Sequence, residues 1–263
     1  MIPDSEEIEK FERHVNALLS LTEEILKNPI RYSFDEDHFG FMVLCFTTKQ
    51  YDHLRSISVL IKAGLPRDAA ILARVMMEGM VALLWVVKNG GNEFSRQWRA
   101  YSLISDFRRM QKKKADGEDI DPSVEKKLIK GLDKEGEQFF SKKALKSNKE
   151  GTELPHDPYR KRWLDKMVPE IFSEIGQDIL YEQYSYYSDW VHWNPQGLGR
   201  ALQTKENITR FRSKAPEEEA GSFACGFMAV YETLNLLIKH FKLDNESDLK
   251  KIRDDYVSDF EKN

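Results

Sequence analysis

Residues 63–85 read AGLPRDAAILARVMMEGMVALLW, and this stretch decides the fold. Gly64 is typical of a position just after a helix end, and Pro66 is typical of a first helical turn. Two long helices, at about 41–63 and 66–89, therefore meet across a very short link. A link of this length makes the two helices antiparallel neighbours. The sequence predicts a buried helical hairpin at the centre of the protein.

The second helix of this hairpin is apolar enough to raise the question of a membrane. From Ala69 to Val87 the only charged residues are Arg74 and Glu78. A span of this length could cross a bilayer. However, two ionisable residues near its centre would cost a lone helix roughly 5–7 kcal/mol, and the partner helix has the polar middle TTKQYDHLRS. We therefore expect the central helix of a soluble bundle and no membrane contact.

The rest of the chain has the same helical period. Apolar residues recur at spacings of three and four, and alternating Val/Ile-rich runs bounded by turn residues are absent. We predict helices at about 4–28, 41–63, 66–89, 93–114, 122–145, 158–174, 177–193, 216–241 and 246–261. The expected fold class is all-α, a multi-helix bundle of about eight helices. An N-terminal packing helix (1–30) lies against a single helical domain (40–262).

Composition and charge narrow the class of protein. Hydrophobic residues make up 41% and charged residues 32% of the 263 residues, which suits a soluble globule. The net charge is -4, so nucleic acid is a possible partner that the electrostatic field of the whole molecule does not support. Cys45 and Cys225 are isolated in apolar stretches, so neither a disulfide framework nor a zinc site is indicated. The acidic start MIPDSEEIEKFERH is no signal peptide, and we expect a cytoplasmic protein.

The two charges of the central helix are the first candidate site. Arg74 and Glu78 are four residues apart and share a helix face. If the helix is surrounded, a buried charge needs a hydrogen-bonded partner. The pair either fixes the register of the helices or lines a polar cleft. In the second case Arg67, on the same face of the helix, could extend the cleft toward the surface. Glu78→Ala is expected to cost roughly 3–5 kcal/mol if it leaves Arg74 buried and unpaired.

Residues 187–199, YSDWVHWNPQGLG, supply the second half of the candidate site. Ser188 and His192 are also four residues apart on the expected helix, whereas Asp189 lies about a quarter-turn away. Histidine can act as an acid or base near neutral pH, and serine is a nucleophile only if a base reaches it. A satisfied core histidine is the alternative.

Together these two stretches resemble a known family. AGLPRDAAILARVMMEGMVALLW, followed about a hundred residues later by YSYYSDWVHWNPQGL, is similar to an uncharacterised domain-of-unknown-function family of microbial all-helical proteins, family 5677. The resemblance covers roughly residues 50–205 and implies an all-helical fold. It marks Arg74, Glu78, Ser188 and His192 as the matching positions. The family has no assigned activity, but it looks like helical domains of prokaryotic defence and toxin proteins, some of which are RNases.

Two functions remain open. The favoured one is a helical interaction or regulatory module whose internal polar cluster is structural. The alternative is a nuclease-like hydrolase in which Arg74 stabilises an anion, Glu78 holds Arg74, Ser188 donates a hydrogen bond and His192 moves a proton. Whether the protein is an enzyme is left open. No motif indicates a cofactor or metal. The apolar C-terminal helix permits a homodimer, and a protein partner is not identified.

Overall fold

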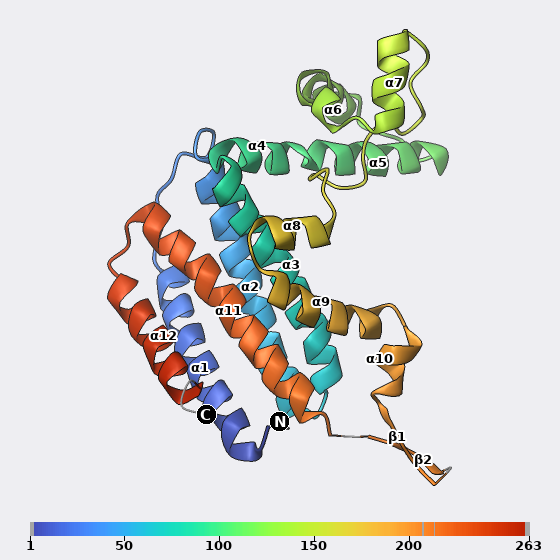
Figure 1. Cartoon of the computed structure of the whole chain (residues 1–263). Helices are drawn as coiled ribbons and strands as arrows, with labels where there is room; N and C mark the ends of the chain where they lie inside the picture. Colours follow the sequence, from blue (N-terminus) through green and yellow to red (C-terminus); the bar gives the residue numbers. More distant parts are fainter. Residues whose placement is uncertain (1–2, 207, 213, 261–263) are drawn as a thin grey trace. The chain divides into compact units, whose positions relative to one another are not determined.

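The computed structural model describes residues 3–206, 208–212 and 214–260 (Figure 1). The chain is 73% helical, so the predicted all-α class is confirmed. It forms two compact units, residues 1–89 with 168–263 (unit 1) and residues 90–167 (unit 2). The prediction of one helical domain over 40–262 stays a prediction, because compactness does not measure whether each unit folds alone.

Unit 1 is built around the predicted hairpin. Its elements are α1 (Ser5–Lys27), α2 (His38–Lys62), α3 (Pro66–Asn89), α8 (Val168–Glu174), α9 (Asp178–Val191), α10 (Pro195–Gly199), β1 (Leu202–Lys205), β2 (Ile208–Phe211), α11 (Pro216–Phe241) and α12 (Glu246–Phe260). Gly64, at φ 75°, ends α2 in the left-handed region that favours glycine. α3 packs against α2, α11, α9 and α8, so the central position predicted for it is confirmed.

A glycine on α11 allows a close approach between two long helices of this core. A Cβ atom at Gly226 would lie 2.8 Å from Cδ1 of Leu54 and 3.4 Å from Cδ1 of Ile57, both on α2. Leu54 and Ile57 are fully buried. The absence of a side chain at Gly226 therefore allows α11 to pack directly on the α2–α3 hairpin. On its other side α11 contacts α1 and α12.

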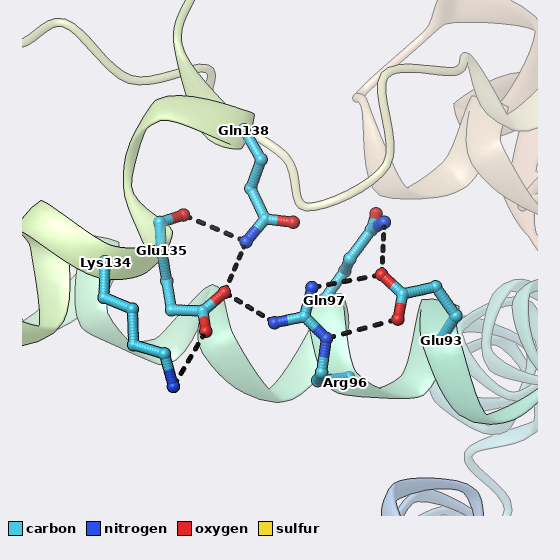
Figure 2. A network of polar contacts seen from close by, with 6 residues as sticks. All are labelled: Glu93, Arg96, Gln97, Lys134, Glu135 and Gln138. Carbon is cyan, nitrogen blue, oxygen red and sulfur yellow. Dashed lines mark hydrogen bonds and ion pairs between the residues drawn. The ribbon is translucent and has the colours of Figure 1, made fainter.

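Unit 2 is a small helical unit with its own core. It contains α4 (Asn92–Ala100), α5 (Ser102–Ala115), α6 (Pro122–Glu135), a 3-10 turn (Glu137–Phe139) and α7 (Lys142–Glu150). Figure 2 shows how Arg96 of α4 is held. Its Nη1 donates to Glu135 at 2.6 Å, and its Nε and Nη2 donate to the two carboxylate oxygens of Glu93. These two carboxylates accept from all three nitrogens of the guanidinium. Because Glu135 is the last residue of α6, the network links α4 to the end of α6.

Two predicted long helices of unit 2 are each broken in two. The helix expected over 93–114 breaks at Tyr101, whose hydroxyl donates to the carbonyl of Arg160 at 3.0 Å. The helix expected over 122–145 breaks at Gly136, where a Cβ atom would lie 2.6 Å from the carbonyl oxygen of Leu132. The contact at Tyr101 joins residues far apart in the chain, which a local period does not record.

The helix expected over 158–174 was wrong in its first half. A short bridge between Tyr159 and Phe140, followed by bends over 161–166, replaces it. At the bridge, the N–H of Ser141 donates to the carbonyl of Pro158 and the N–H of Arg160 donates to that of Phe139, each at 2.8 Å. Helix α8 starts only at Val168, with Pro169 in its first turn, where proline is tolerated.

The structure contains a β-hairpin that the sequence did not predict. β1 and β2 pair antiparallel, with Leu202 opposite Phe211 and Lys205 opposite Ile208. All eight residues of the two strands are exposed. Strands without a buried face need no alternating apolar pattern, so the usual strand signal is missing. In Figure 1 the hairpin extends away from the helices of unit 1.

Helices α3 and α11 are both long and apolar enough to cross a bilayer by length and composition. Within the most apolar window of each, 50% of α3 and 61% of α11 is buried inside the protein. A core helix of a folded unit passes the same test, so this finding is weak evidence of a membrane. The expected absence of membrane contact stays a prediction.

Candidate functional site

The structure brings three of the four predicted site residues together on α3 and α9. The Nε of Arg74 donates to Oγ of Ser188 at 2.8 Å, and its Nη2 donates to the hydroxyl of Tyr184 at 2.7 Å. The guanidinium also lies over the Tyr184 ring, 4.6 Å from its centroid. We call Arg74, Glu78, Tyr184 and Ser188 the Arg74 cluster. It joins the middle of the central helix to the last two turns of α9.

Glu78 is the loosest member of the Arg74 cluster. Its Oε2 lies 3.8 Å from Nη1 of Arg74, and its side chain is 46% exposed against 15% for Arg74. The ion pair is therefore weak, since exposed partners at this distance contribute little. Loss of several kcal/mol of stability in Glu78→Ala was expected only if the change left Arg74 buried and unpaired. This condition is not met, because Arg74 keeps its hydrogen bonds to the hydroxyls of Tyr184 and Ser188.

His192 lies outside these contacts. Helix α9 ends at Val191, and His192 is the exposed C-cap residue, whose backbone N–H donates to the carbonyl of Ser188. Its side chain forms no hydrogen bond or ion pair with the described residues. A catalytic role for Arg74, Glu78, Ser188 and His192 stays a prediction.

Arg67 does not extend the polar stripe to the surface. It is 8% exposed and donates from Nη2 to the carbonyl of Arg212 at 2.9 Å, beneath the rings of Trp190 and Phe211. Arg67 and the buried Glu218 line a cavity of about 10 Å³, roughly what one water molecule needs. The expectation for Arg67 was wrong because the hairpin and α9 cover it.

A larger cavity, of about 690 Å³, lies between α9, α11 and α12. We call it the α9–α11–α12 cavity. Its walls are mostly apolar and include Leu180, Phe227, Met228 and Tyr256. Burial raises the pKa of the Cys225 thiol in its wall to about 12, so this sulfur stays protonated and is a poor nucleophile near neutral pH.

One carboxylate of the cavity wall, Glu232, has no hydrogen bond or ion pair with the described residues. It is half-buried. Desolvation by burial raises the pKa of its carboxyl above the ordinary 4.5, although Arg253 and Lys239 act to lower it. The cavity therefore holds a charge that the folded protein stabilises less well than water does.

We expect Glu232→Gln to raise the melting temperature near pH 7 and to change it little near pH 4. An acid with a raised folded-state pKa contributes stability below its unfolded pKa and loses that contribution as the pH rises through its folded pKa. The wild type therefore loses stability over this range, and the variant does not. Thermal unfolding at both pH values measures the difference. Glu182→Gln, on the exposed rim of the same cavity, is the matched control, and an equal shift at both pH values contradicts the prediction.

The role of Tyr184 as a principal partner of Arg74 was not predicted, although the i, i+4 spacing of Tyr184 and Ser188 indicates a shared helix face. The α9–α11–α12 cavity was not predicted at all. That cavity is formed by three helices whose residues lie up to about eighty positions apart in the chain, and no local pattern marks it. Among the described residues, no three His, Cys, Asp or Glu side chains converge as metal ligands.

The comparisons with known proteins concern the family only. The sequence model of a family of unknown function, DUF5677, matches residues 40–209. This range contains both stretches on which the resemblance was based, and the resemblance is confirmed. No curated protein and no solved structure is significantly similar to the chain. The match assigns no activity and does not support a nuclease.

Proposed function

Because the chain belongs to a family of unknown function (DUF5677), we propose a function from its geometry: a non-catalytic binding module that takes up a small apolar molecule. The α9–α11–α12 cavity carries this proposal. Its volume of about 690 Å³ lies in the range of small-molecule sites, about 300–1,000 Å³. Such sites combine apolar and aromatic walls with a few polar groups.

The walls favour an apolar ligand. The rings of Phe227 and Tyr256 lie parallel, with centroids 4.2 Å apart and planes at 9°. Burial raises the pKa of the Tyr256 hydroxyl to about 12, so the ring stays neutral. Because the two rings stack on each other, they form one rigid, apolar part of the wall.

Helix α9 connects this cavity to the Arg74 cluster. Gln183 lines the cavity, and the next residue, Tyr184, accepts the hydrogen bond from Arg74. A ligand that moves α9 must therefore work against the contacts that hold α9 on α3. This arrangement supports a regulatory role, in which occupancy of the cavity shifts the position of α9.

The bonding of Ser188 supports a non-catalytic role. The hydroxyl of Ser188 accepts from Arg74 and donates its only proton to the carbonyl of Tyr184 at 2.8 Å. A backbone carbonyl is no base, and a serine needs a base within hydrogen-bond reach to act as a nucleophile. No observation of the site favours the nuclease alternative over binding.

The cavity can be tested with the neutral fluorescent probe N-phenyl-1-naphthylamine, which brightens in apolar surroundings. We expect the wild type to enhance its fluorescence saturably, and Ala224→Trp to lose most of this gain. Ala224 lies in the cavity wall, so an indole there blocks part of the site. Ala63→Trp, at the exposed end of α2, is the matched control and should behave as the wild type.

Equal probe binding by the wild type and Ala224→Trp, with both proteins folded by circular dichroism, would overturn the proposal. So would cleavage of RNA by the purified wild type that His192→Ala or Arg74→Ala abolishes without loss of folding. The expected homodimer and cytoplasmic location remain proposals. The apolar residues of α11 on which the dimer was based pack against α2, α3, α1 and α12 within unit 1.

A further inference from the structure

An exposed tryptophan occupies a glycine position at the end of α9. Trp193 has φ 56° and is 79% exposed. Its N–H donates to the carbonyl of Trp190, and the N–H of Asn194 donates to that of Asp189. These two bonds define the Schellman helix end, in which the left-handed residue is usually glycine.

At three other helix ends this position is glycine, whereas α11 ends at Lys242, with φ 54°. The same pair of bonds ends α2 at Gly64, α5 at Gly117 and α8 at Gly176, each at φ between 72° and 76°. A bulky residue in this region costs about 1–2 kcal/mol relative to glycine. With its side chain mostly in solvent, Trp193 regains little of this cost by packing. The side chain therefore points to a role other than folding.

Positive charge is concentrated directly after this tryptophan. Residues 192–214 contain five Arg or Lys and one Glu, whereas the whole chain has a net charge of -4. Arg200 pairs with Asp189, and Arg212 pairs with Glu217. Lys205, Arg210 and Lys214 are exposed and form no ion pair with the described residues.

The hairpin displays two of these cations, Lys205 and Arg210, on one face and a second exposed ring, Phe211, on the other. Arg210 lies opposite Gln203 in the register, so it shares a face with Gln203 and Lys205. The other face carries Leu202 and Phe211, and Phe211 is 70% exposed. We call Trp193 to Lys214, with α10 and both strands, the arm. It combines unpaired cations with aromatic rings open to solvent.

We propose that the arm binds single-stranded nucleic acid, with bases stacking on Trp193 and Phe211 and with Lys205, Arg210 and Lys214 contacting phosphates. Cations that follow a backbone and rings that stack on bases are the two requirements for sequence-tolerant binding of single strands. The site is separate from the α9–α11–α12 cavity and does not depend on a ligand there. Binding by the arm requires no cleavage.

A membrane surface is the competing partner for a basic and aromatic arm. In that case the hairpin turn would enter the lipid first, and it should then be apolar. Here the strand end at the turn pairs the exposed Ile208 with Lys205, which is followed by Glu206, whereas the larger apolar pair Leu202 and Phe211 lies at the opposite end of the strands. This order favours nucleic acid.

The test uses fluorescence anisotropy of fluorescein-labelled uridine and thymidine oligonucleotides of about twelve nucleotides, at about 50 mM salt. We expect a dissociation constant of about 10⁻⁴ to 10⁻⁶ M for the full-length wild type. Trp193→Gly should weaken binding about fivefold or more while its melting temperature stays unchanged or rises. Trp193→Phe keeps a stacking ring and should stay within about threefold of the wild type. Comparing the two sugars shows whether RNA or DNA is preferred.

The cations give a second, independent readout. Three phosphate contacts predict that the logarithm of the association constant falls with the logarithm of the salt concentration with a slope of about -2. The double variant Lys205→Gln/Arg210→Gln keeps one contact and should reduce the slope to about -0.7. Wild-type affinity in Trp193→Gly would overturn the proposal, as would absence of binding at about 100 μM protein. Capture by phosphatidylserine vesicles without binding of either oligonucleotide would assign the arm to membranes instead. Concentration-dependent oligomers without oligonucleotide binding would assign it to self-association.

Discussion

Replacing Leu54 by Ala is expected to lower the free energy of unfolding by about 3–5 kcal/mol. The side chain is fully buried on α2 and lies under Gly226 of α11. The loss combines the transfer of three carbon atoms with the cavity left between two long helices. Urea unfolding followed by circular dichroism measures it, at constant slope against denaturant. Val59→Ala, on the same helix but 66% exposed, should change stability by no more than about 0.5 kcal/mol.

The contact between these two helices makes a sharper test possible. In Leu54→Ala, a methyl group added by Gly226→Ala enters the vacated space and gains helix propensity of about 1 kcal/mol. With Leu54 present, the same methyl group lies 2.8 Å from a leucine methyl group, and its gain is offset by crowding. The double variant should therefore be more stable than the sum of the two single changes implies. Additive changes would show that α2 and α11 do not meet at these residues.

Arg74→Met is expected to cost about 3 kcal/mol, whereas Glu78→Ala should cost only about 0.5 kcal/mol. Methionine keeps much of the apolar stem but removes two charge-assisted hydrogen bonds, to Ser188 and Tyr184. Glu78→Ala removes a long, half-exposed ion pair and leaves those two bonds in place. Urea unfolding of both variants measures the contrast.

The reverse order would contradict the bonding described for the Arg74 cluster. A cost of several kcal/mol for Glu78→Ala, as expected for a sealed ion pair, would mean that the carboxylate is the main partner of Arg74. Ser188→Ala provides a control, because it should account for part of the Arg74→Met effect. The effects of Ser188→Ala and Arg74→Met should be less than additive, since they remove the same hydrogen bond.

The candidate site was partly readable from the sequence. A charged pair inside an apolar helix predicts buried polar contacts, and the i, i+4 spacing of Tyr184 and Ser188 places two hydroxyls on one face of α9. The sequence did not reveal that Arg74 bonds to these hydroxyls more closely than to Glu78. That preference depends on where α9 crosses α3, and residues more than a hundred positions apart decide it.

The sequence by itself determined the helical class, the α2–α3 hairpin and its turn at Gly64. These features depend on neighbours three or four residues away and on the backbone freedom of single residues. Only the tertiary structure decided the α9–α11–α12 cavity, the burial of Arg67 and the exposure of Trp193 and the hairpin. Each of these depends on which faces of distant elements meet. A helical period shows that a face is apolar, but it does not show which other face covers it or whether the two fill the space between them.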